Sequence, residues 1–278
     1  MRAEVEQAAE LARRGDAEAL SQAIALLQGT VYSFSMKVCG HPQDAEDTMQ
    51  ETLLRVSPML KKIANPKALA VWLYKVARSR CLMSRRRSKF AAAPDLSLEA
   101  LMPERKDLES LAAEREKDPE RSLLKRESQA ALRAAIDKLP PEYRLVLVLH
   151  DMEELSTEEV ARISGLKPGT VRVRLHRARL FLRNELSPSA RRKRKSAPRP
   201  RHCREMFAAL SEFLDDELPP DLCRNLERHM ADCRPCETFL ESLRQTVERC
   251  RQFQPADGAG CAAQVRSLLE QYKGAAAR

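Results

Sequence analysis

The stretch LSTEEVARISGLKPGTVRVRLHRARLFLRNEL, residues 155–186, contains the signals that decide the fold of this chain. Ser156 and Glu159 stand three residues apart, which is the spacing of a capping box at the start of a helix. Gly165 suits the left-handed residue that ends such a helix, and Pro168 suits the first turn of the next one. Two helices joined by so tight a turn, the second with cations near its start, are typical of a helix-turn-helix that reads DNA.

The faces of the second predicted helix indicate different roles for its side chains. An inward apolar stripe at helical spacing consists of Val171, Leu175, Ala178 and Leu182. A neighbouring face, predicted to point outward, carries Arg172, His176, Arg179 and Arg183. Side chains near the start of a reading helix reach base edges, and those predicted to do so are Arg172, Val173, His176 and Arg177. The cations predicted to meet phosphates or solvent are Arg174, Arg179 and Arg183. An ordinary helical hairpin with a solvated arginine face is the alternative.

The composition favours an all-α fold. Aromatic residues make up 4% and charged residues 32% of the 278 residues, there are eight glycines, and Ala, Leu, Glu and Arg are frequent. No stretch approaches the roughly 18 uninterrupted apolar residues of a membrane span, and the N-terminal residues lack the apolar core of a signal peptide. We therefore expect a cytoplasmic protein with reduced thiols, whose eight cysteines serve metal or redox chemistry rather than a disulfide framework.

Charge is distributed unevenly along the chain. From His202 onward there are 10 Lys/Arg against 13 Asp/Glu, a net charge of −3. Subtracting these from the totals of 49 and 40 leaves 39 against 27, or +12, for the first 201 residues. A basic body followed by a mildly acidic segment indicates a protein that binds a polyanion and carries a separate module.

Periodicity and helix breakers divide the chain into six predicted parts. They are a helical domain, a proline-containing linker, the helix-turn-helix domain, a basic linker without an apolar face, a compact helical segment and a tail, over residues 1–89, 90–122, 123–186, 187–201, 202–250 and 251–278. The predicted fold is thus all-α, with two helical domains joined by a flexible linker and a small third helical domain.

Several blocks follow one another in a definite order. They are ARRGDAEAL (12–20), DAEDTMQETLLRV (44–56), WLYKVARSRCLMSRRR (72–87) and LPPEYRLVLVLHDMEELSTEEVARISGLKPGTVRVRLHRARLFL (139–182). In this order they resemble the bacterial extracytoplasmic-function (group IV) RNA polymerase sigma factors over about residues 8–186. The resemblance implies core RNA polymerase and promoter DNA as partners. At Ser79 and Ser84 the family usually has Asn and Asp, so contacts with the melted strand are expected to differ here.

The resemblance also implies roles for polar residues of the first domain. The side chains implied to bind the polymerase clamp, along the polar side of one helix, are Asp44, Asp47, Gln50 and Glu51. The cations implied to bind upstream phosphates and the opened strand are Lys75, Arg78, Arg80 and the run Arg85, Arg86 and Arg87. Taken alone, the acids are ordinary solvated charges. Trp72 and Tyr74 carry rings suited to base stacking, but Trp72 lies on the apolar stripe and is predicted to be structural.

A candidate metal site lies in the stretch HMADCRPC, residues 229–236. Its histidine and cysteines have the spacing H-x3-C-x2-C, in which the first pair faces one side of a helix and the following proline turns the chain. Tetrahedral zinc needs a fourth ligand, which Cys203 supplies if a helix over 221–232 folds back on one over 203–218; His202 is the alternative. The predicted Zn²⁺ ligands are Cys203, His229, Cys233 and Cys236.

The same segment resembles the zinc-binding anti-sigma domain over about residues 203–245, since LSEFLDDELPPDL (210–222) lies between the ligand pairs. The remaining cysteines lack ligand spacing. Cys223, Cys250 and Cys261 are interpreted as packing or exposed thiols, and Cys39 and Cys81 as small core residues.

These observations lead to one main hypothesis, a sigma factor regulated in cis by a fused zinc-binding domain that contacts the sigma domains. Whether this domain inhibits or assists is open at this stage. A stand-alone helix-turn-helix regulator with a metal or redox sensor is the alternative, and core polymerase binding separates the two. A zinc enzyme is disfavoured, because the predicted ligand set is closed and no nucleophile constellation or phosphate loop accompanies it.

Overall fold

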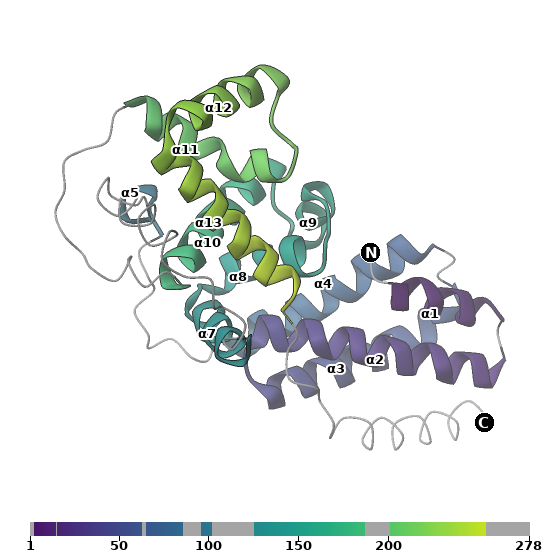
Figure 1. Ribbon diagram of the computed structural model, residues 1–278. Coiled ribbons are helices and arrows are strands. Elements are labelled where there is room, and N and C mark those ends of the chain that lie inside the picture. The colour runs from purple at the N-terminus through teal and green to yellow at the C-terminus, as the bar shows by residue number, and fades with distance from the viewer. Residues whose placement is uncertain are drawn as a thin grey trace. The chain divides into compact units, whose positions relative to one another are not determined.

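The computed structural model describes residues 3–14, 16–62, 65–85, 96–101, 125–186 and 201–253. Over this part of the chain all regular structure is helical, so the predicted all-α class is confirmed (Figure 1). The chain divides into two compact units. The first combines the residues up to Ala91 with Val148–Leu166, and the second combines Ala92–Leu147 with Lys167–Phe253. None of the described helices has the length and apolarity needed to cross a bilayer.

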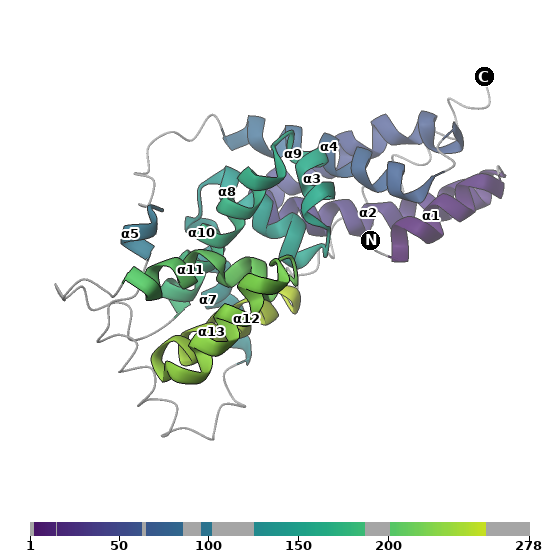
Figure 2. The ribbon, with the colours of Figure 1, turned by 90° about the horizontal axis from the view of Figure 1, so that it is seen from above.

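The first unit is a bundle around α2. Its helical elements are α1 (Ala3–Arg14), α2 (Ala17–Cys39), α3 (Pro42–Val56), the 3-10 helix η1 (Ser57–Lys62), α4 (Pro66–Arg85), the π-helical turn η3 (Val148–Met152) and α9 (Thr157–Ser164). Helix α2 packs against α1, α3 and α4, and α9 packs against α4 (Figure 2). The core includes the apolar stripe of α3 and η1, formed by Ala45, Met49, Leu53, Val56 and Leu60.

Local signals fix both ends of α2. The Asp16 side chain accepts a hydrogen bond of 2.7 Å from the Ala19 amide, which satisfies one of the free donors of the first turn. Gly40 ends the helix at φ 80°, in the left-handed region that other residues rarely adopt. This sharp end allows Pro42 to begin α3 directly afterwards.

The expectation for Cys39 and Cys81 needs a correction. Both are buried, as predicted, but their sulfur atoms form a disulfide that joins the end of α2 to α4. Periodicity placed each cysteine in the core without indicating that the two face each other, because their sequence separation is 42 residues. The expectation of metal or redox chemistry rather than a structural disulfide is therefore wrong for this pair.

The helix-turn-helix signals act locally as predicted. The Ser156 side chain accepts a hydrogen bond from the Glu159 amide, and the Glu159 carboxylate accepts one from the Ser156 amide at 3.1 Å. Gly165 ends α9 at φ 68°, and Pro168 begins the next helix. A side chain at Gly165 would be strained by this backbone conformation.

The second unit is organised around the long helix α10. Its helices are α5 (Leu98–Leu101), α7 (Lys125–Lys138), α8 (Pro141–Leu147), α10 (Pro168–Leu186), α11 (Arg201–Leu214), α12 (Pro220–Asp232) and α13 (Arg234–Arg251). Helix α10 packs against α5, α7, α8, α11 and α13. Consequently α10 belongs to two interfaces, one with α7 and α8 and one with the C-terminal helices α11 and α13.

The predicted helix over 203–218 is shorter in the structure. Helix α11 ends at Leu214, and Asp216 adopts φ 55° in the turn that follows. Phe207 and Leu210 of its predicted stripe are buried, whereas Leu214 and Leu218 are only half-buried. The linker predicted over 187–201 lies, apart from Arg201, outside the described residues, and the predicted domain boundaries stay predictions.

Candidate metal centre and nucleic-acid interface

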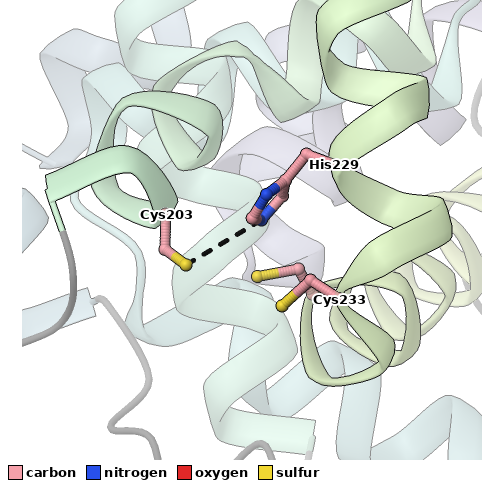
Figure 3. Close-up of side chains that lie close together, drawn as sticks. Cys203, His229 and Cys233 are labelled. Atoms are coloured by element: carbon pink, nitrogen blue, oxygen red, sulfur yellow. Dashed lines mark hydrogen bonds between the residues drawn. The ribbon is translucent and has the colours of Figure 1, made fainter.

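One histidine and three cysteines converge in the second unit. Cys203 lies in the first turn of α11, His229 in the last turn of α12 and Cys233 between α12 and α13 (Figure 3). Cys236 lies in the first turn of α13. One ligand atom from each lies within 4.8 Å of the others, and Cys203 Sγ is 3.8 Å from His229 Nε2. Zinc–sulfur distances of about 2.3 Å in a tetrahedron place neighbouring ligand atoms about 4 Å apart, so these residues fit zinc.

The junction of α12 and α13 brings the cysteines together. Cys233 ends α12 and begins α13 with φ −126°, and Pro235 lies in the first turn of α13. Cys236 is 2% exposed, and its burial, followed by the nearby thiols of Cys233 and Cys203, raises the pKa of its thiol well above the ordinary range. A bound dication favours the thiolate form, so this donor set suits a metal better than free thiols. The side chain of the alternative ligand His202 lies outside the described residues.

Two faces of α10 are buried, where sequence analysis predicted one. The inward stripe is buried as predicted, at Val171, Leu175, Ala178 and Leu182. The face predicted to point outward is also covered for most of its length, since His176 is 6%, Arg179 0% and Arg183 2% exposed. The prediction that Arg179 and Arg183 meet phosphates or solvent therefore does not hold in this structure, because α11 and α13 cover them.

Side chains from the C-terminal segment accept hydrogen bonds from the arginines of this covered face. Arg179 donates two hydrogen bonds to the Asp215 carboxylate, at 2.8 and 2.7 Å, in a bidentate pair. Arg172 Nε donates to Glu217 Oε2 at 2.8 Å. Neither acid was among the predicted site residues, although the acidic run Asp215–Glu217 directly follows an amphipathic helix in the sequence.

The far end of α10 contacts α13. Arg183 Nε donates to Ser242 Oγ at 3.1 Å, and the Arg183 guanidinium lies 4.3 Å from the ring centre of Phe239. Phe239 is fully buried and also contacts the ring of Phe207 from α11. The apolar core between α11 and α13 thus extends to α10, where Arg183 lies against the ring of Phe239.

His176 is held neutral at this interface. Its Nδ1 lies 2.8 Å from Ser211 Oγ, in a hydrogen bond between α10 and α11. Burial, followed by the positive charges of Arg179 and Arg177, lowers the pKa of His176 to about 4. A neutral histidine at neutral pH can pair with a hydroxyl without adding another cation to a face that already carries several.

The first turns of α10 remain open. Val173 is 50% exposed, and Lys167, Pro168 and Thr170 are exposed. Arg174 is half-buried, 5.9 Å from the ring centre of Tyr143, and Arg177 is also half-buried. The predicted base-reading residues therefore fall into two groups, with Val173 accessible and His176 covered.

The predicted polymerase and strand contacts lie on α3 and α4 of the first unit. Asp47 is exposed and Asp44 and Gln50 are half-buried, whereas Glu51 pairs with Arg80 and, at 2.7 Å, with Arg55. Lys75 is exposed. Trp72 is half-buried, and Tyr74 is 4% exposed with its hydroxyl donating to Glu153, so its ring is not free to stack on a base.

Comparison with known proteins identifies three parts of this chain. The family models for Sigma-70 region 2, Sigma-70 region 4 and a zinc finger match residues 23–90, 129–182 and 203–236. The RNA polymerase sigma factor SigE of Mycolicibacterium smegmatis is 39% identical over 160 residues, which are 56% of this chain and 57% of SigE. SigW of Bacillus subtilis is 28% identical over 177 residues, 63% of this chain and 92% of SigW. The sigma-E factor of Escherichia coli is 28% identical over 187 residues, which are 66% of this chain and 94% of the sigma-E factor.

Regions 2 and 4 in this order, with a helix-turn-helix in the second, define a sigma factor, which is a transcription initiation factor and not an enzyme. The chain belongs to the extracytoplasmic-function sigma factors and carries a C-terminal zinc-finger domain of the kind found in anti-sigma factors. The resemblance inferred from the sequence is thereby confirmed. It spans a little over half the length of SigE and most of the length of the other two relatives.

Proposed function

We propose that this chain binds core RNA polymerase in the cytoplasm, directs initiation at a promoter with two short elements, and is restrained in cis by helices α11 to α13. One observation carries the regulatory part: Arg179 of the recognition helix α10 is fully buried in a bidentate pair with Asp215. The carboxylate occupies the guanidinium fork with the geometry that a DNA phosphate would otherwise use. Asp215 and a phosphate therefore compete for the same side chain.

The charges of the two segments support this competition. The C-terminal residues from His202 carry −3 and the preceding 201 residues +12, from the counts given above. Glu217 and Asp215 place two of these acids on Arg172 and Arg179. Because the interface includes partly solvent-exposed pairs, we expect salt to weaken it, as it also weakens phosphate binding.

Zinc held by Cys203, His229, Cys233 and Cys236 would serve a structural purpose in this scheme. The four residues come from α11, from α12 and from the start of α13, so a metal here ties all three helices together. Bound zinc would supply the folding free energy that a small three-helix segment with few core residues lacks. Ser211 of α11 and Asp215 just after it, which contact α10, are held in place through this scaffold.

The direct test uses purified core polymerase. The full chain is expected to co-elute with core polymerase in gel filtration and to support run-off transcription from a promoter selected with the resulting holoenzyme. Residues 1–186 are expected to bind core polymerase and to transcribe more strongly than the full chain. Failure of both proteins to bind core polymerase, together with retained promoter binding, would instead indicate the stand-alone regulator. A folded but inactive 1–186 would show that the zinc-binding helices assist.

Arg177 provides a test of base reading. We expect Arg177→Ala to weaken recognition of the upstream promoter element by about 1–3 kcal/mol, roughly 5- to 150-fold, because a guanidinium in this part of a recognition helix can hold a base edge. Binding of core polymerase should not change. Arg172→Ala is less clean, since it also breaks the pair with Glu217. Arg228→Ala removes the same charge from exposed α12 and should leave promoter recognition intact; an equal loss for both variants contradicts the assignment.

A further inference from the structure

A buried polar cluster in the first unit has no role in the scheme above. Lys37 Nζ of α2 donates to Glu153 Oε1 at 2.7 Å, and the Tyr74 hydroxyl of α4 donates to Glu153 Oε2 at 2.7 Å. The side chains of Lys37 and Glu153 are 3% and 0% exposed. Glu153 directly follows η3 and is 116 residues from Lys37 in sequence. The cluster therefore fastens the segment 148–166, which contains α9, onto the region 2 helices.

The same segment covers part of α4, the helix that carries the cations predicted to bind the opened strand. Helix α9 packs on α4, and Arg78 Nη1 donates to the carbonyl of Ile163 at 3.3 Å. The Arg78 guanidinium is partly buried there, and this burial lowers its pKa. While α9 lies on α4, the Nη1 donor that bonds the Ile163 carbonyl is not available to a phosphate of an opened strand.

We propose that segment 148–166 is an autoinhibitory latch, fastened by Glu153 to Lys37 and Tyr74, that must leave α4 before the promoter can be melted. The effect of the latch on promoter melting rests on the proposed sigma function, whereas the opening of segment 148–166 does not. The latch would be a second restraint, in which segment 148–166 of region 4 covers α4 of region 2. The first restraint is the cover that α11 and α13 place on α10.

The chemistry of the cluster suits a reversible contact. Burying an ion pair removes the hydration of both charges, and much of the gain from pairing is spent on that desolvation. When the segment departs, Lys37 and Glu153 recover water, so separation costs less than exposing an apolar contact of similar size. Removing one partner destabilises the closed state alone. The remaining charge is then buried without its counter-charge when the segment is closed, but is hydrated when the segment is open, so opening is favoured.

Two variants of the full chain separate a latch from a purely structural contact. Glu153→Gln leaves Lys37 buried without its carboxylate and should open the segment. The triple variant Lys37→Met, Tyr74→Phe and Glu153→Leu replaces the whole polar cluster by apolar side chains, a change that often preserves or stabilises a buried contact, and should keep the segment closed. Tyr74→Phe removes one hydrogen bond and should act in the direction of Glu153→Gln with a smaller effect, which keeps the test decisive if Glu153→Gln does not fold.

Hydrogen exchange of the α9 amides, 157–164, reports opening without reference to function. We expect exchange at least roughly tenfold faster in Glu153→Gln than in the natural chain or the triple variant, with the amides of α1 and α2 unchanged. With core polymerase, Glu153→Gln should also reduce the protein concentration needed for half-maximal promoter opening by roughly tenfold.

Unchanged exchange in both single variants would overturn the latch, and so would faster exchange with unchanged promoter opening. If no variant and not even the natural chain binds core polymerase, the sigma function fails while the exchange measurement still decides whether the segment opens.

Discussion

Replacing Asp215 by alanine is expected to raise promoter-specific transcription by the full chain with core polymerase by roughly 10- to 100-fold. Asp215 makes both hydrogen bonds to the fully buried Arg179 guanidinium. Truncating one partner of a buried, hydrogen-bonded charge pair costs about 2–5 kcal/mol, largely because the other charge is left buried and unpaired. The interface between α10 and α11 should therefore loosen and leave Arg179 available to a phosphate. Quantitative run-off transcription, with a titration of promoter DNA, measures the change.

The matched control is Asp221→Ala. It removes the same charge from the same C-terminal segment, but the Asp221 side chain is 87% exposed and pairs with Arg224 of its own helix. Surface pairs of this kind contribute little, so transcription should stay close to that of the natural chain. A decrease in transcription for Asp215→Ala, with the control unchanged, would show that the contact between α11 and α10 assists initiation instead of restraining it.

Replacing Cys236 by serine is expected to remove bound zinc and to unfold most of α11 to α13. The natural protein should contain one zinc per chain by elemental analysis, with an apparent binding free energy on the order of 10 kcal/mol, as in zinc-finger peptides. Cys236 is the most buried of the four candidate ligands, so another side chain cannot easily take its place. Loss of the metal should expose 203–245 to proteolysis and raise transcription, because the restraint on α10 depends on the folded helices.

Cys223→Ser is the control for this variant. Cys223 is a cysteine of the same helical segment, but its thiol contacts the Glu227 carboxylate at 3.7 Å and is not among the converging residues. Zinc content and transcription should be those of the natural protein. Zinc content equal to that of the natural protein in Cys236→Ser would exclude this ligand set, and full occupancy in Cys203→Ser would transfer the fourth position to another residue such as His202.

The sequence by itself determined the elements and the identity of most candidate residues. The capping box of Ser156 and Glu159, Gly165 at a left-handed turn and Pro168 at a helix start are local signals, and the structure shows each acting locally. Ligand spacing within 229–236 is also local, because His229 lies in the last turn of α12, Cys233 caps that helix and Cys236 lies in the first turn of α13. The apolar stripes of α3 and α10 follow from a period of 3.6 residues, which reflects burial of one side of a helix.

Only the tertiary structure decided what covers the remaining polar faces. A row of arginines on a helix has the same pattern whether it meets solvent, DNA or acids from another segment, so periodicity could not place Arg179 against Asp215. Contacts between residues far apart in sequence, such as Lys37 with Glu153 and Cys39 with Cys81, leave no periodic trace in either segment. Such pairings follow from how whole helices pack, because burial of a charge or a thiol is stable only when packing supplies its partner.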